Sequence, residues 1–387
     1  MLRVITRLNI GGPSIQATRL SHALTAHGFD TLLIHGRLGD GEGDMSYLLP
    51  PGQRVQRVDA LQRPVAPWSD LRAAFALYRA MRAFRPHLLH THMAKAGLLG
   101  RVAAAAFNAT HPSQRIRVVH TYHGHVLDGY FSGWTTRLFI ALERSLAGVT
   151  DMLIGVSARV HDDLLNRYRI GSPDRFKVLS LGLDLDEFAD IDARRRHVAR
   201  VALAIAPDTR VVTTVGRLTA IKHHSLFLAM AQRIAAESGD VIFLIAGGGE
   251  LESQLRAEAL ARGLADRVRF LGWRRDLATI YGASDLFVLT SLNEGTPVAL
   301  IEAMSAGVPG VATDVGGVRD VIVDESMGLV VASDEPDALT RAVRDLLSDD
   351  DARARMGAAA RSEVLARFKF GRLVEDVVTL YRQLLTE

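Results

Sequence analysis

The sequence contains no cysteine. Disulfides, thiolate metal sites and a cysteine nucleophile are therefore excluded, and this composition is typical of proteins in a reducing cytoplasm. No apolar run reaches the roughly 20 residues that a transmembrane helix needs. The first residues, MLRVITRLNIGGP, read as a strand and a turn, so we expect no signal peptide. Together these features predict a cytoplasmic protein.

Lysine is scarce as well, with only Lys95, Lys177, Lys222 and Lys369, so arginine carries most of the positive charge. The formal net charge is only +3, but it is unevenly distributed. Residues 1–185 carry 22 Arg and Lys against 13 Asp and Glu, whereas the remaining residues carry 24 against 30. A basic first half favours attraction to an anionic surface, such as the cytoplasmic leaflet or a lipid diphosphate.

The best candidate for this surface is the helical pattern SDLRAAFALYRAMRAFRPH, which places Arg72, Arg79, Arg82 and Arg85 among apolar residues. Two interpretations stay open. The helix either contacts an anionic membrane peripherally, or it is an ordinary amphipathic helix that covers a sheet and leaves its arginines in solvent. We do not expect nucleic acid as a partner, because no aromatic and basic interleaving accompanies the charge.

A chain of 387 residues is too long for one ordinary hydrophobic core, and 48% hydrophobic with 23% charged residues is typical of globular domains. Short apolar segments alternate with helical patterns, which predicts an α/β fold of two doubly wound parallel sheets. The connection between them is expected near residues 181–196, ending in DIDARRRHVAR. Strands are expected at residues 2–8, 31–35, 87–92, 118–122, 152–156 and 178–181, and at 211–215, 241–246, 268–271, 286–290, 310–313 and 329–331.

The segment SLNEGTPVALIEAMSAGVP carries two carboxylates, Glu294 and Glu302, around the start of one short helix. Thr296 is a favourable N-cap and Pro297 a favourable first residue, so we expect a helix over residues 297–306. Its free N–H groups and positive dipole end would attract a diphosphate. The two glutamates would then accept hydrogen bonds from hydroxyl groups on either side of the phosphates.

Cations should accompany an anion that is bound between carboxylates. The segment VVTTVGRLTAIKHH supplies them, because Gly216 opens a turn after an apolar strand and Arg217 and Lys222 follow. Arg217 can bind two phosphate oxygens at once, whereas Lys222 is a mobile point charge. The alternative interpretation is that the glutamates are solvated helix charges, with these two cations as their partners in surface ion pairs.

The segments GRLTAIKHH, AGGGE, FLGWRRDL and EGTPVALIEAMSAGVPGVATDVGG resemble the donor half of the family 4 glycosyltransferases, and the match covers nearly the whole chain. The resemblance implies the GT-B fold, in which two Rossmann-like domains face each other across a cleft. It implies an acceptor-binding domain over residues 1–184 and a nucleotide-sugar-binding domain over residues 185–370. The last helix, within residues 371–387, would cross back onto the first domain.

The same resemblance assigns roles to single residues. It places Glu294 at the transferred sugar, Glu302 at the ribose, and Arg217 and Lys222 at the diphosphate. Backbone N–H groups after the first glutamate would also bind phosphate. That set comprises Gly295, Thr296, Pro297 and Val298, of which proline has no N–H to give.

Four glycine-rich turns complete the expected donor site. Their backbones could approach a ligand closely because glycine has no side chain. The resemblance implies a phosphate or acceptor contact for the first turn, and base and ribose contacts for the last two. The implied residues are Gly12, Gly216, Gly248 and Gly272, with Trp273 at the edge of the base pocket.

Histidines gather in HLLHTHMAKAG and VVHTYHGHVLDGYFSGW. His90 and His120 are expected to be buried with satisfied hydrogen bonds. We do not expect a metal here, because strand alternation sends neighbouring histidines to opposite faces and no carboxylate completes a site. His123 matches the family position that reaches the transferred sugar, with His125 as its close rival.

The TYHGHVLDGYFS segment resembles a bacterial surface-polysaccharide subgroup of the family. In that subgroup this loop and HTHMAKAG would frame the acceptor. Lys95 could then meet an acceptor phosphate, and Asp128 is the only acid in its loop. The expected acceptor residues are therefore His92, Lys95, His125 and Asp128.

The triplet Asp184-Leu185-Asp186 has the acid-x-acid pattern that binds a divalent metal in other glycosyltransferases. In this chain it is part of LSLGLDLDEF, which resembles a hinge motif of family 4. The family usually has Asn where this chain has Leu181. We expect neither a metal nor another cofactor. Arg217, Lys222 and the helix dipole would stabilise the leaving diphosphate instead.

The resemblance therefore implies a retaining hexosyltransferase that moves a sugar from a nucleoside diphosphate sugar to a glycan or lipid-linked acceptor in polysaccharide biosynthesis. Two alternatives stay open. A sugar-nucleotide 2-epimerase would release a free sugar without an acceptor, and a noncatalytic nucleotide-sugar-binding protein would not turn over at all. Localisation is expected to be cytoplasmic, with possible peripheral contact to the cytoplasmic face of an anionic membrane.

Overall fold

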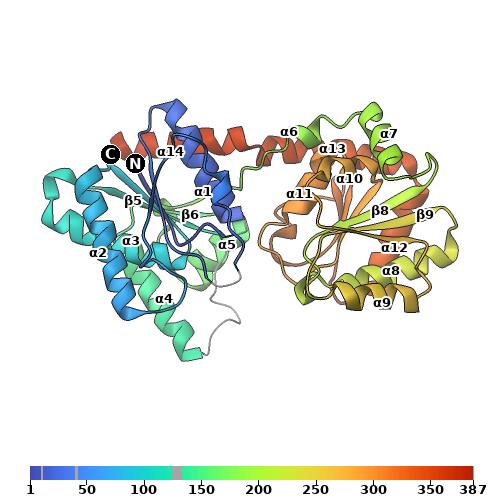
Figure 1. Ribbon diagram of the computed structural model, residues 1–387, viewed down its shortest axis with the longest axis horizontal. Coiled ribbons are helices and arrows are strands. Elements are labelled where there is room, and N and C mark those ends of the chain that lie inside the picture. The colour runs from blue at the N-terminus through green and yellow to red at the C-terminus, as the bar shows by residue number, and fades with distance from the viewer. Residues whose placement is uncertain (10–11, 40–41, 124–132, 387) are drawn as a thin grey trace. The chain divides into compact units, whose positions relative to one another are not determined.

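The computed structural model describes residues 1–9, 12–39, 42–123 and 133–386 (Figure 1). The chain forms two compact units. The first comprises Met1–Gly182 together with Gly371–Glu387, and the second comprises Leu183–Phe370. The chain therefore passes between the units twice, and the first passage lies two residues before the division expected after residue 184.

The first unit contains a fully parallel sheet in the order β3-β2-β1-β4-β5-β6-β7. Its strands are β1 (Leu2–Ile5), β2 (Leu32–His35), β3 (Arg54–Arg57), β4 (Leu88–His92), β5 (Arg117–Tyr122), β6 (Met152–Gly155) and β7 (Phe176–Val178). Its α-helices are α1 (Gly12–Ala23), α2 (Pro67–Phe84), α3 (Ala94–Thr110), α4 (Gly133–Ala147), α5 (Ala158–Asp162) and α14 (Phe370–Thr386).

The second unit contains another fully parallel sheet in the order β10-β9-β8-β11-β12-β13. Its strands are β8 (Arg210–Val215), β9 (Val241–Ala246), β10 (Val268–Gly272), β11 (Leu286–Leu289), β12 (Gly310–Thr313) and β13 (Gly328–Val331). Its α-helices are α6 (Asp186–Ala189), α7 (Ala193–Ala202), α8 (His224–Glu237), α9 (Glu252–Ala261), α10 (Leu277–Ala283), α11 (Val298–Ser305), α12 (Pro336–Ser348) and α13 (Asp350–Phe368).

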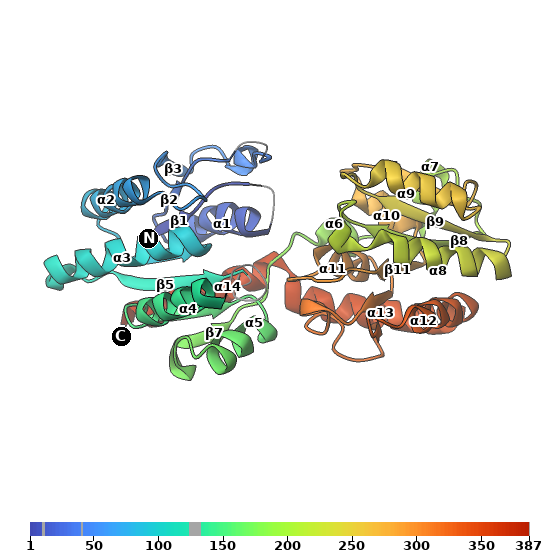
Figure 2. The ribbon, with the colours of Figure 1, turned by 90° about the horizontal axis from the view of Figure 1, so that it is seen from below.

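Helices cover both faces of each sheet because successive strand residues point to opposite sides. In the first unit, Val4 packs toward α2 and α3, whereas Ile5 packs toward α1. The helices α2, α3 and α4 lie side by side over one face (Figure 2). In the second unit, Val288 packs toward α8, α9 and α12, and Phe287 packs toward α10, α11 and α13. The expected doubly wound α/β class is confirmed.

Eleven of the expected strands lie at or close to the expected residues, the twelfth, expected at residues 178–181, lies earlier as β7 (Phe176–Val178), and β3 was not expected. Its residues, Arg54–Arg57, are mostly exposed and it forms an edge of the sheet, so it lacks the apolar run that identified the others. The charged run DIDARRRHVAR, in which the connection was expected to end, is mainly helical. Most of it forms α7, whose N-cap is Asp192, because the Asp192 side chain accepts a hydrogen bond from the N–H of Arg195 at 2.8 Å.

The two segments that pass between the units are tied together. Leu183 forms a parallel bridge with Lys369, and its N–H donates to the Phe368 carbonyl at 2.7 Å. The Arg372 guanidinium in α14 donates to the carbonyl of Ser180 at 2.7 Å. Among the described residues, none of the helices combines the length and the apolar character that crossing a bilayer requires.

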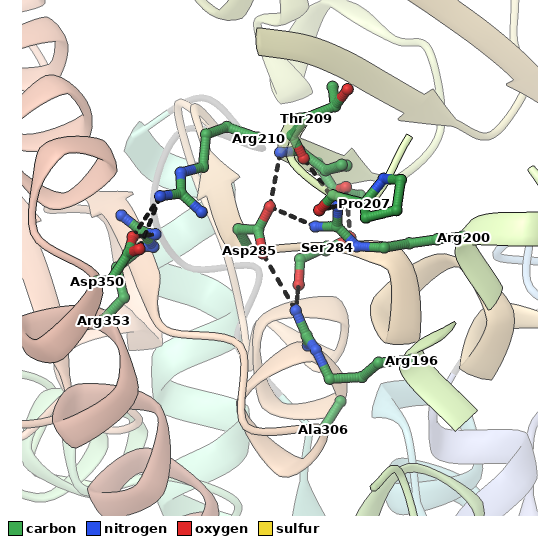
Figure 3. A network of polar contacts seen from close by, with 12 residues as sticks. Arg196, Arg200, Pro207, Thr209, Arg210, Ser284, Asp285, Ala306, Asp350 and Arg353 are labelled. Carbon is green, nitrogen blue, oxygen red and sulfur yellow. Dashed lines mark hydrogen bonds and ion pairs between the residues drawn. The ribbon is translucent and has the colours of Figure 1, made fainter. Parts of the chain in front are cut away.

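A largely buried arginine network fastens α7 to the sheet of the second unit (Figure 3). Asp285, just before β11, accepts a hydrogen bond from Arg200 at 2.7 Å and from Arg196 at 3.2 Å. It also accepts from the backbone N–H of Val211 at 2.8 Å. The network lies at the amino ends of β8 and β11, so it is a structural element at the edge opposite to the strand carboxyl ends.

We predict that Asp285→Ala destabilises the protein by about 3 kcal/mol, because it leaves two largely buried arginines without their carboxylate. Urea denaturation measures the change. The matched control is Glu237→Ala, which removes an exposed carboxylate 2.7 Å from the exposed Arg344 in the same unit. That control should cost less than about 1 kcal/mol, and equal losses in the two variants would contradict the assignment.

Candidate active site

Four loops of the second unit meet where its strands end, because the carboxyl ends of parallel strands share one edge. The loop after β8 is hydrogen-bonded to the loop after β9, since Leu218 N–H donates to the Gly248 carbonyl at 3.0 Å. The loop after β11 contacts both of its neighbours: Leu292 N–H donates to Ile221 at 2.8 Å, and Gly295 accepts from Gly317 N–H at 3.0 Å. The loops therefore form one continuous surface.

This surface depends on two glycines that allow close backbone approach. A β-carbon on Gly247 would lie 1.9 Å from the Gly216 carbonyl oxygen, and one on Gly316 would lie 1.7 Å from the Glu294 carbonyl oxygen. Both glycines also have positive φ, +136° and +53°. A side chain at either position would push neighbouring loops apart.

Lys222 and Glu294 form an ion pair across two of these loops. The Lys222 Nζ lies 2.6 Å from Glu294 Oε1, which also accepts a hydrogen bond from Ser291 Oγ at 2.6 Å. The Glu294 side chain is only 8% exposed and that of Lys222 is 23% exposed. The pairing matches the alternative interpretation in which these charges are each other's partners, but it lies at the strand carboxyl ends rather than on an open helix surface.

Arg217 differs from Lys222, because its exposed guanidinium has no polar partner among the described residues. Three buried polar atoms between this loop and the start of α8 also have no hydrogen-bond partner among the described residues: Thr219 Oγ1, His223 Nδ1 and His224 Nδ1. Burial lowers the pKa of His224 to about 4, and the positive charge of Lys222 adds to the effect. The loop after β8 thus offers a free cation and unsatisfied hydrogen-bonding groups together.

The helix that follows Glu294 begins slightly later than expected. It runs over Val298–Ser305 with Pro297 as the N-cap residue, and no side chain caps it, so Thr296 is not the N-cap. Pro297 has ψ near 83°, which is outside the helical range, so it cannot be the first helical residue. The first N–H groups of α11 have no partners within the helix, and the exposed Gly295 precedes them.

Glu302 lies one turn into α11. The Tyr281 hydroxyl donates a hydrogen bond to its Oε2 at 3.0 Å. Burial raises the pKa of Glu302 to about 7; the hydrogen bond from Tyr281 opposes this shift, and the negative charge of Glu187 adds to it. Near neutral pH the carboxyl is thus poised between its two forms, and hydroxyl donors from a ligand would favour the ionised one.

The loop after β10 supplies Gly272 and Trp273. Gly272 has φ of +65°, and the Trp273 ring is 72% exposed. A β-carbon on Gly248 would lie 2.5 Å from the Trp273 ring nitrogen, so the ring lies directly on that glycine. These expected base-site residues therefore lie together, next to the loop after β8.

In the first unit, β4 and β5 carry the expected histidines. His90 and His120 are buried and hydrogen-bonded, as expected: His90 Nε2 lies 2.7 Å from Thr121 Oγ1, and His120 Nδ1 lies 2.8 Å from Thr91 Oγ1. The expectation that neighbouring histidines face opposite sides is wrong for His90 and His92, which are two residues apart. They share a face, and their rings stack with centroids 4.3 Å apart.

His92 and His123 are joined directly, because His92 Nδ1 lies 2.9 Å from His123 Nε2. His92 is fully buried, so it is not exposed to an acceptor as expected, whereas His123 is half-buried. Burial, with a contribution from the charge of Arg3, lowers the pKa of His123 to about 3. Both rings are therefore neutral at physiological pH.

The remaining expected acceptor residues are placed in different ways. Lys95 forms an ion pair with Asp70 at 2.6 Å, with both side chains largely buried, so its charge is already neutralised. Gly12 is the first residue of α1. His125 and Asp128 lie outside the described residues.

The acidic triplet is also placed by the structure. Asp186 begins α6, and its carboxylate lies 2.9 Å from the Lys369 Nζ. Within the described part of the chain, no group of three or more His, Asp and Glu side chains is arranged to hold a metal ion.

Two family models match this chain. Residues 10–187 match the family described as Glycosyltransferase Family 4, and residues 196–363 match the family described as Glycosyl transferases group 1. The chain belongs to the family 4 glycosyltransferases. Both halves of the sequence therefore carry the family signature, including each of the donor loops described above.

Two curated relatives illustrate the breadth of the family. An Escherichia coli UDP-Gal:alpha-D-GlcNAc-diphosphoundecaprenol alpha-1,3-galactosyltransferase is 29% identical to this glycosyltransferase over 343 residues, covering 88% of the chain and 86% of the relative. A D-inositol 3-phosphate glycosyltransferase of Salinispora tropica is 31% identical over 63% of the chain. That second match spans 53% of the relative, about half its length.

Solved structures show the same GT-B fold. A glycosyltransferase from Rickettsia africae ESF-5 has a TM-score of 0.81 and 16% identity, covering 99% of this chain and 98% of its own. Anabaena Alr3699/HepE, solved in complex with UDP-glucose, has a TM-score of 0.76 and 19% identity, covering 99% of each chain. At this identity the likeness establishes the fold of the glycosyltransferase and no more.

Several residues that hold the site together were not anticipated. Ser291 and Tyr281 hydrogen-bond the two glutamates, and Gly316 allows the loop after β12 to approach. Gly316 is the second-last residue of the motif that identified the donor half, so the sequence did contain a signal for it. Arg3 and Tyr381 flank the histidines. Arg3 could have been noticed in the sequence, because an arginine inside the apolar strand LRVI is unusual. Nothing in the sequence around Tyr381 indicates that it contacts the histidines.

We predict that Glu302→Gln stabilises the unliganded glycosyltransferase at pH 8 by about 2 kcal/mol. This is less than the full pKa shift would give, because the Glu302 side chain is partly exposed to solvent. Because the folded-state pKa of Glu302, about 7, exceeds the usual glutamate pKa of 4.5, wild-type stability falls as the pH rises through that interval. Glutamine removes this loss and can still accept from Tyr281. Urea denaturation midpoints of wild type and Glu302→Gln at pH 5 and pH 8 measure the difference in stability. A stability gain of the variant at pH 5 equal to that at pH 8 would contradict the raised pKa of Glu302.

Proposed function

We propose that this protein is a retaining glycosyltransferase that moves a sugar from a nucleoside diphosphate sugar to a hydroxyl of a glycan or lipid-linked acceptor in polysaccharide biosynthesis. The observation that carries the proposal is the pair Lys222–Glu294 beside Arg217, whose guanidinium has no polar partner among the described residues. A diphosphate next to Lys222 would give Arg217 its missing anion.

The proposed chemistry follows from where charge develops. As the bond from the anomeric carbon to the phosphate oxygen breaks, negative charge grows on the departing diphosphate. Arg217, Lys222 and the free N–H groups at the start of α11 are preorganised donors for that charge. Glu294 would bind hydroxyls of the transferred sugar, and Glu302 would bind hydroxyls of the ribose.

A double-displacement mechanism with a carboxylate nucleophile does not suit these two glutamates. The Glu294 carboxylate is engaged by Lys222 and Ser291, and the Glu302 carboxyl by Tyr281. Retention would instead proceed by attack on the same face of the sugar, with the leaving phosphate helping to deprotonate the acceptor hydroxyl. This is the mechanism that the family resemblance implies.

We also propose that the reaction needs no divalent metal. Asp186, the second acid of the Asp-Leu-Asp triplet, is paired with Lys369, and Arg217 and Lys222 already supply positive charge for a diphosphate. Transfer should therefore continue in the presence of EDTA.

The names of the relatives support the proposed kinds of substrate. The Escherichia coli relative is named for a UDP-sugar donor and a lipid diphosphate acceptor, and Anabaena HepE was solved with UDP-glucose. The proposed alternatives, a sugar-nucleotide 2-epimerase or a noncatalytic binding protein, differ in their need for an acceptor. Donor turnover that depends on an added glycan or lipid-linked acceptor supports a transferase over both.

The proposed donor class is tested by thermal-shift screening against UDP-glucose, UDP-galactose, UDP-N-acetylglucosamine and GDP-mannose, because a bound ligand stabilises the folded state by mass action. We predict that one of them raises the melting temperature of wild type. Arg217→Ala should abolish the rise and lower kcat/KM for transfer by about 100-fold. Its own unfolding free energy should stay within about 0.5 kcal/mol of wild type.

The matched control is Arg210→Ala, at the opposite end of the same strand, where the arginine pairs with Asp350. It should keep both the ligand-induced shift and the transfer rate. Undiminished transfer by Arg217→Ala would overturn the phosphate-binding role, and the absence of a shift with every nucleotide-sugar would overturn the donor class.

The acceptor proposal includes contact with an anionic membrane. On α2, Trp68, Leu71 and Phe75 are 80%, 63% and 61% exposed, and Arg72 and Arg79 are exposed beside them. Their spacing of three and four residues places the apolar side chains on one stripe. Isolated exposed apolar residues are ordinary, but an aromatic stripe flanked by arginines is typical of helices that lie in a membrane interface.

We predict that the protein cosediments with vesicles of phosphatidylglycerol and phosphatidylcholine but weakly with phosphatidylcholine alone, and that 0.5 M salt weakens the binding. Replacing Trp68, Leu71 and Phe75 together by serine should lower bound protein by at least about 10-fold, since about 25 cal/mol is lost per Å² of apolar surface. The control Val198→Ser with Val201→Ser removes exposed apolar residues of α7 and should bind like wild type. Equal binding by both variants would overturn the membrane proposal.

A further inference from the structure

Arg3 is a fully buried arginine in β1 with no carboxylate partner among the described residues. Its Nη1 lies 3.0 Å from His92 Nε2, and its Nη2 donates to the Tyr381 hydroxyl at 3.1 Å. A guanidinium has donors only, so each partner atom must accept. This one-way requirement fixes the direction of every hydrogen bond that follows from it.

The first chain of hydrogen bonds leads to His123. Because His92 Nε2 accepts from Arg3, the hydrogen of the neutral His92 ring is on Nδ1. His92 Nδ1 then donates to His123 Nε2 at 2.9 Å. The hydrogen of the neutral His123 ring must consequently be on its own Nδ1. Both rings are neutral because burial, with the charge of Arg3 adding to it, lowers the pKa of His123 to about 3 and that of His92 well below its usual value.

The second chain ends inside the protein. The Tyr381 hydroxyl accepts from Arg3, and among the described residues His90 Nδ1 is the acceptor within reach of its single hydrogen, so we assign this bond as Tyr381 to His90. The His90 hydrogen is then on Nε2, which donates to Thr121 Oγ1 at 2.7 Å. The same arginine thus gives His90 and His123 opposite tautomers.

The two chains differ at their ends. Thr121 is buried and accepts the last hydrogen bond of its chain, whereas His123 Nδ1 is buried and has no hydrogen-bond partner among the residues that the structure describes. An unpaired buried N–H is costly, and such groups in folded proteins are usually paired. His123 as a whole is only half-buried, and a ligand oxygen that reached Nδ1 would supply the missing acceptor.

We propose that Arg3 and His92 are positioning residues that hold His123 with its hydrogen on Nδ1, so that His123 presents one N–H donor and no free lone pair to the substrate. The proposal deepens the proposed function, on which it rests for the identity of the ligand. The acceptor is an oxygen of the bound substrate. His123 then acts as a hydrogen-bond donor and cannot be the base that deprotonates the acceptor.

The tautomers can be measured without any substrate. Full-length protein labelled with ¹⁵N-histidine gives long-range ¹H–¹⁵N spectra in which protonated and unprotonated ring nitrogens are distinct, and His123→Gln and His90→Gln identify the two rings. We expect the hydrogen on Nδ1 of His123 and on Nε2 of His90. A His123 ring with its hydrogen on Nε2, or one that is charged at pH 7, would overturn the proposal.

Two variants of His92 test the positioning role. His92→Gln can accept from Arg3 through its carbonyl and donate to His123 through its amide, so the tautomer should persist. His92→Leu breaks the chain, so the His123 signals should change and kcat for transfer should fall by at least about 10-fold, with KM changed less. Transfer by His92→Leu at the wild-type rate would overturn the role. Because the His92 ring stacks on His90, the His90 signals will shift, but a His90 hydrogen that stays on Nε2 verifies that this variant is folded.

The matched control is Tyr381→Phe, which removes the second chain but leaves Arg3, His92 and His123 in place. The His123 tautomer and the transfer rate should stay as in wild type, while the His90 signals change. A shift of the His123 hydrogen in this control would overturn the assignment of direction to the Arg3–His92 bond. Failure of the proposed function is distinguishable, because it would abolish wild-type transfer and leave these spectra unaltered.

Discussion

Both sheets are entirely parallel, and this constraint brings all the strand carboxyl ends of a sheet to one edge. In the second unit, that edge joins the loops after β8, β9, β11 and β12 into one surface. Backbone contact between these loops is tight enough that Gly247 and Gly316 cannot carry side chains. The charged residues are therefore held by a rigid framework, and a single helix does not have to position all of them.

The two units use charge differently. In the second unit, Lys222 is balanced by Glu294, while Arg217 is left exposed with no polar partner among the described residues. In the first unit, Arg3 is buried and surrounded by neutral donors and acceptors. An exposed guanidinium can bind an anion directly, whereas a buried one acts by orienting the neutral groups around it. The same residue type therefore supports ligand contact in one unit and hydrogen-bond direction in the other.

Sequence patterns predicted the parts of the fold that depend on apolar periodicity. Every buried strand was anticipated, whereas β3 was not, because an exposed edge strand needs no apolar run. Local capping rules failed at Thr296, where contacts of the preceding loop with the 316–317 turn take precedence over a side-chain cap. The charged run DIDARRRHVAR carries no local sign that its arginines pair with Asp285, because that contact joins segments far apart in the sequence.

The candidate site was predictable where one segment carries several of its residues, as around Glu294 and Glu302. Contacts between distant segments were not, since nothing near Tyr281 indicates that its hydroxyl meets Glu302. The pairing of Lys95 with Asp70 likewise depends on how α2 and α3 pack. Such long-range contacts become visible only when the topology brings the segments together.

The last helix, α14, contributes Tyr381 to the interior of the first unit, where its ring also packs edge-on against Phe29. A fragment that stops at Gly182 would therefore expose the inner face of β1 and β4 to water and lose one of the two acceptors of Arg3. A chimaera that combines halves of two relatives must therefore be divided at the boundaries of the two units, near residues 182 and 371. A chimaera keeps its amino-terminal half intact only if residues 371–387 travel with it, although they are the most distant in sequence.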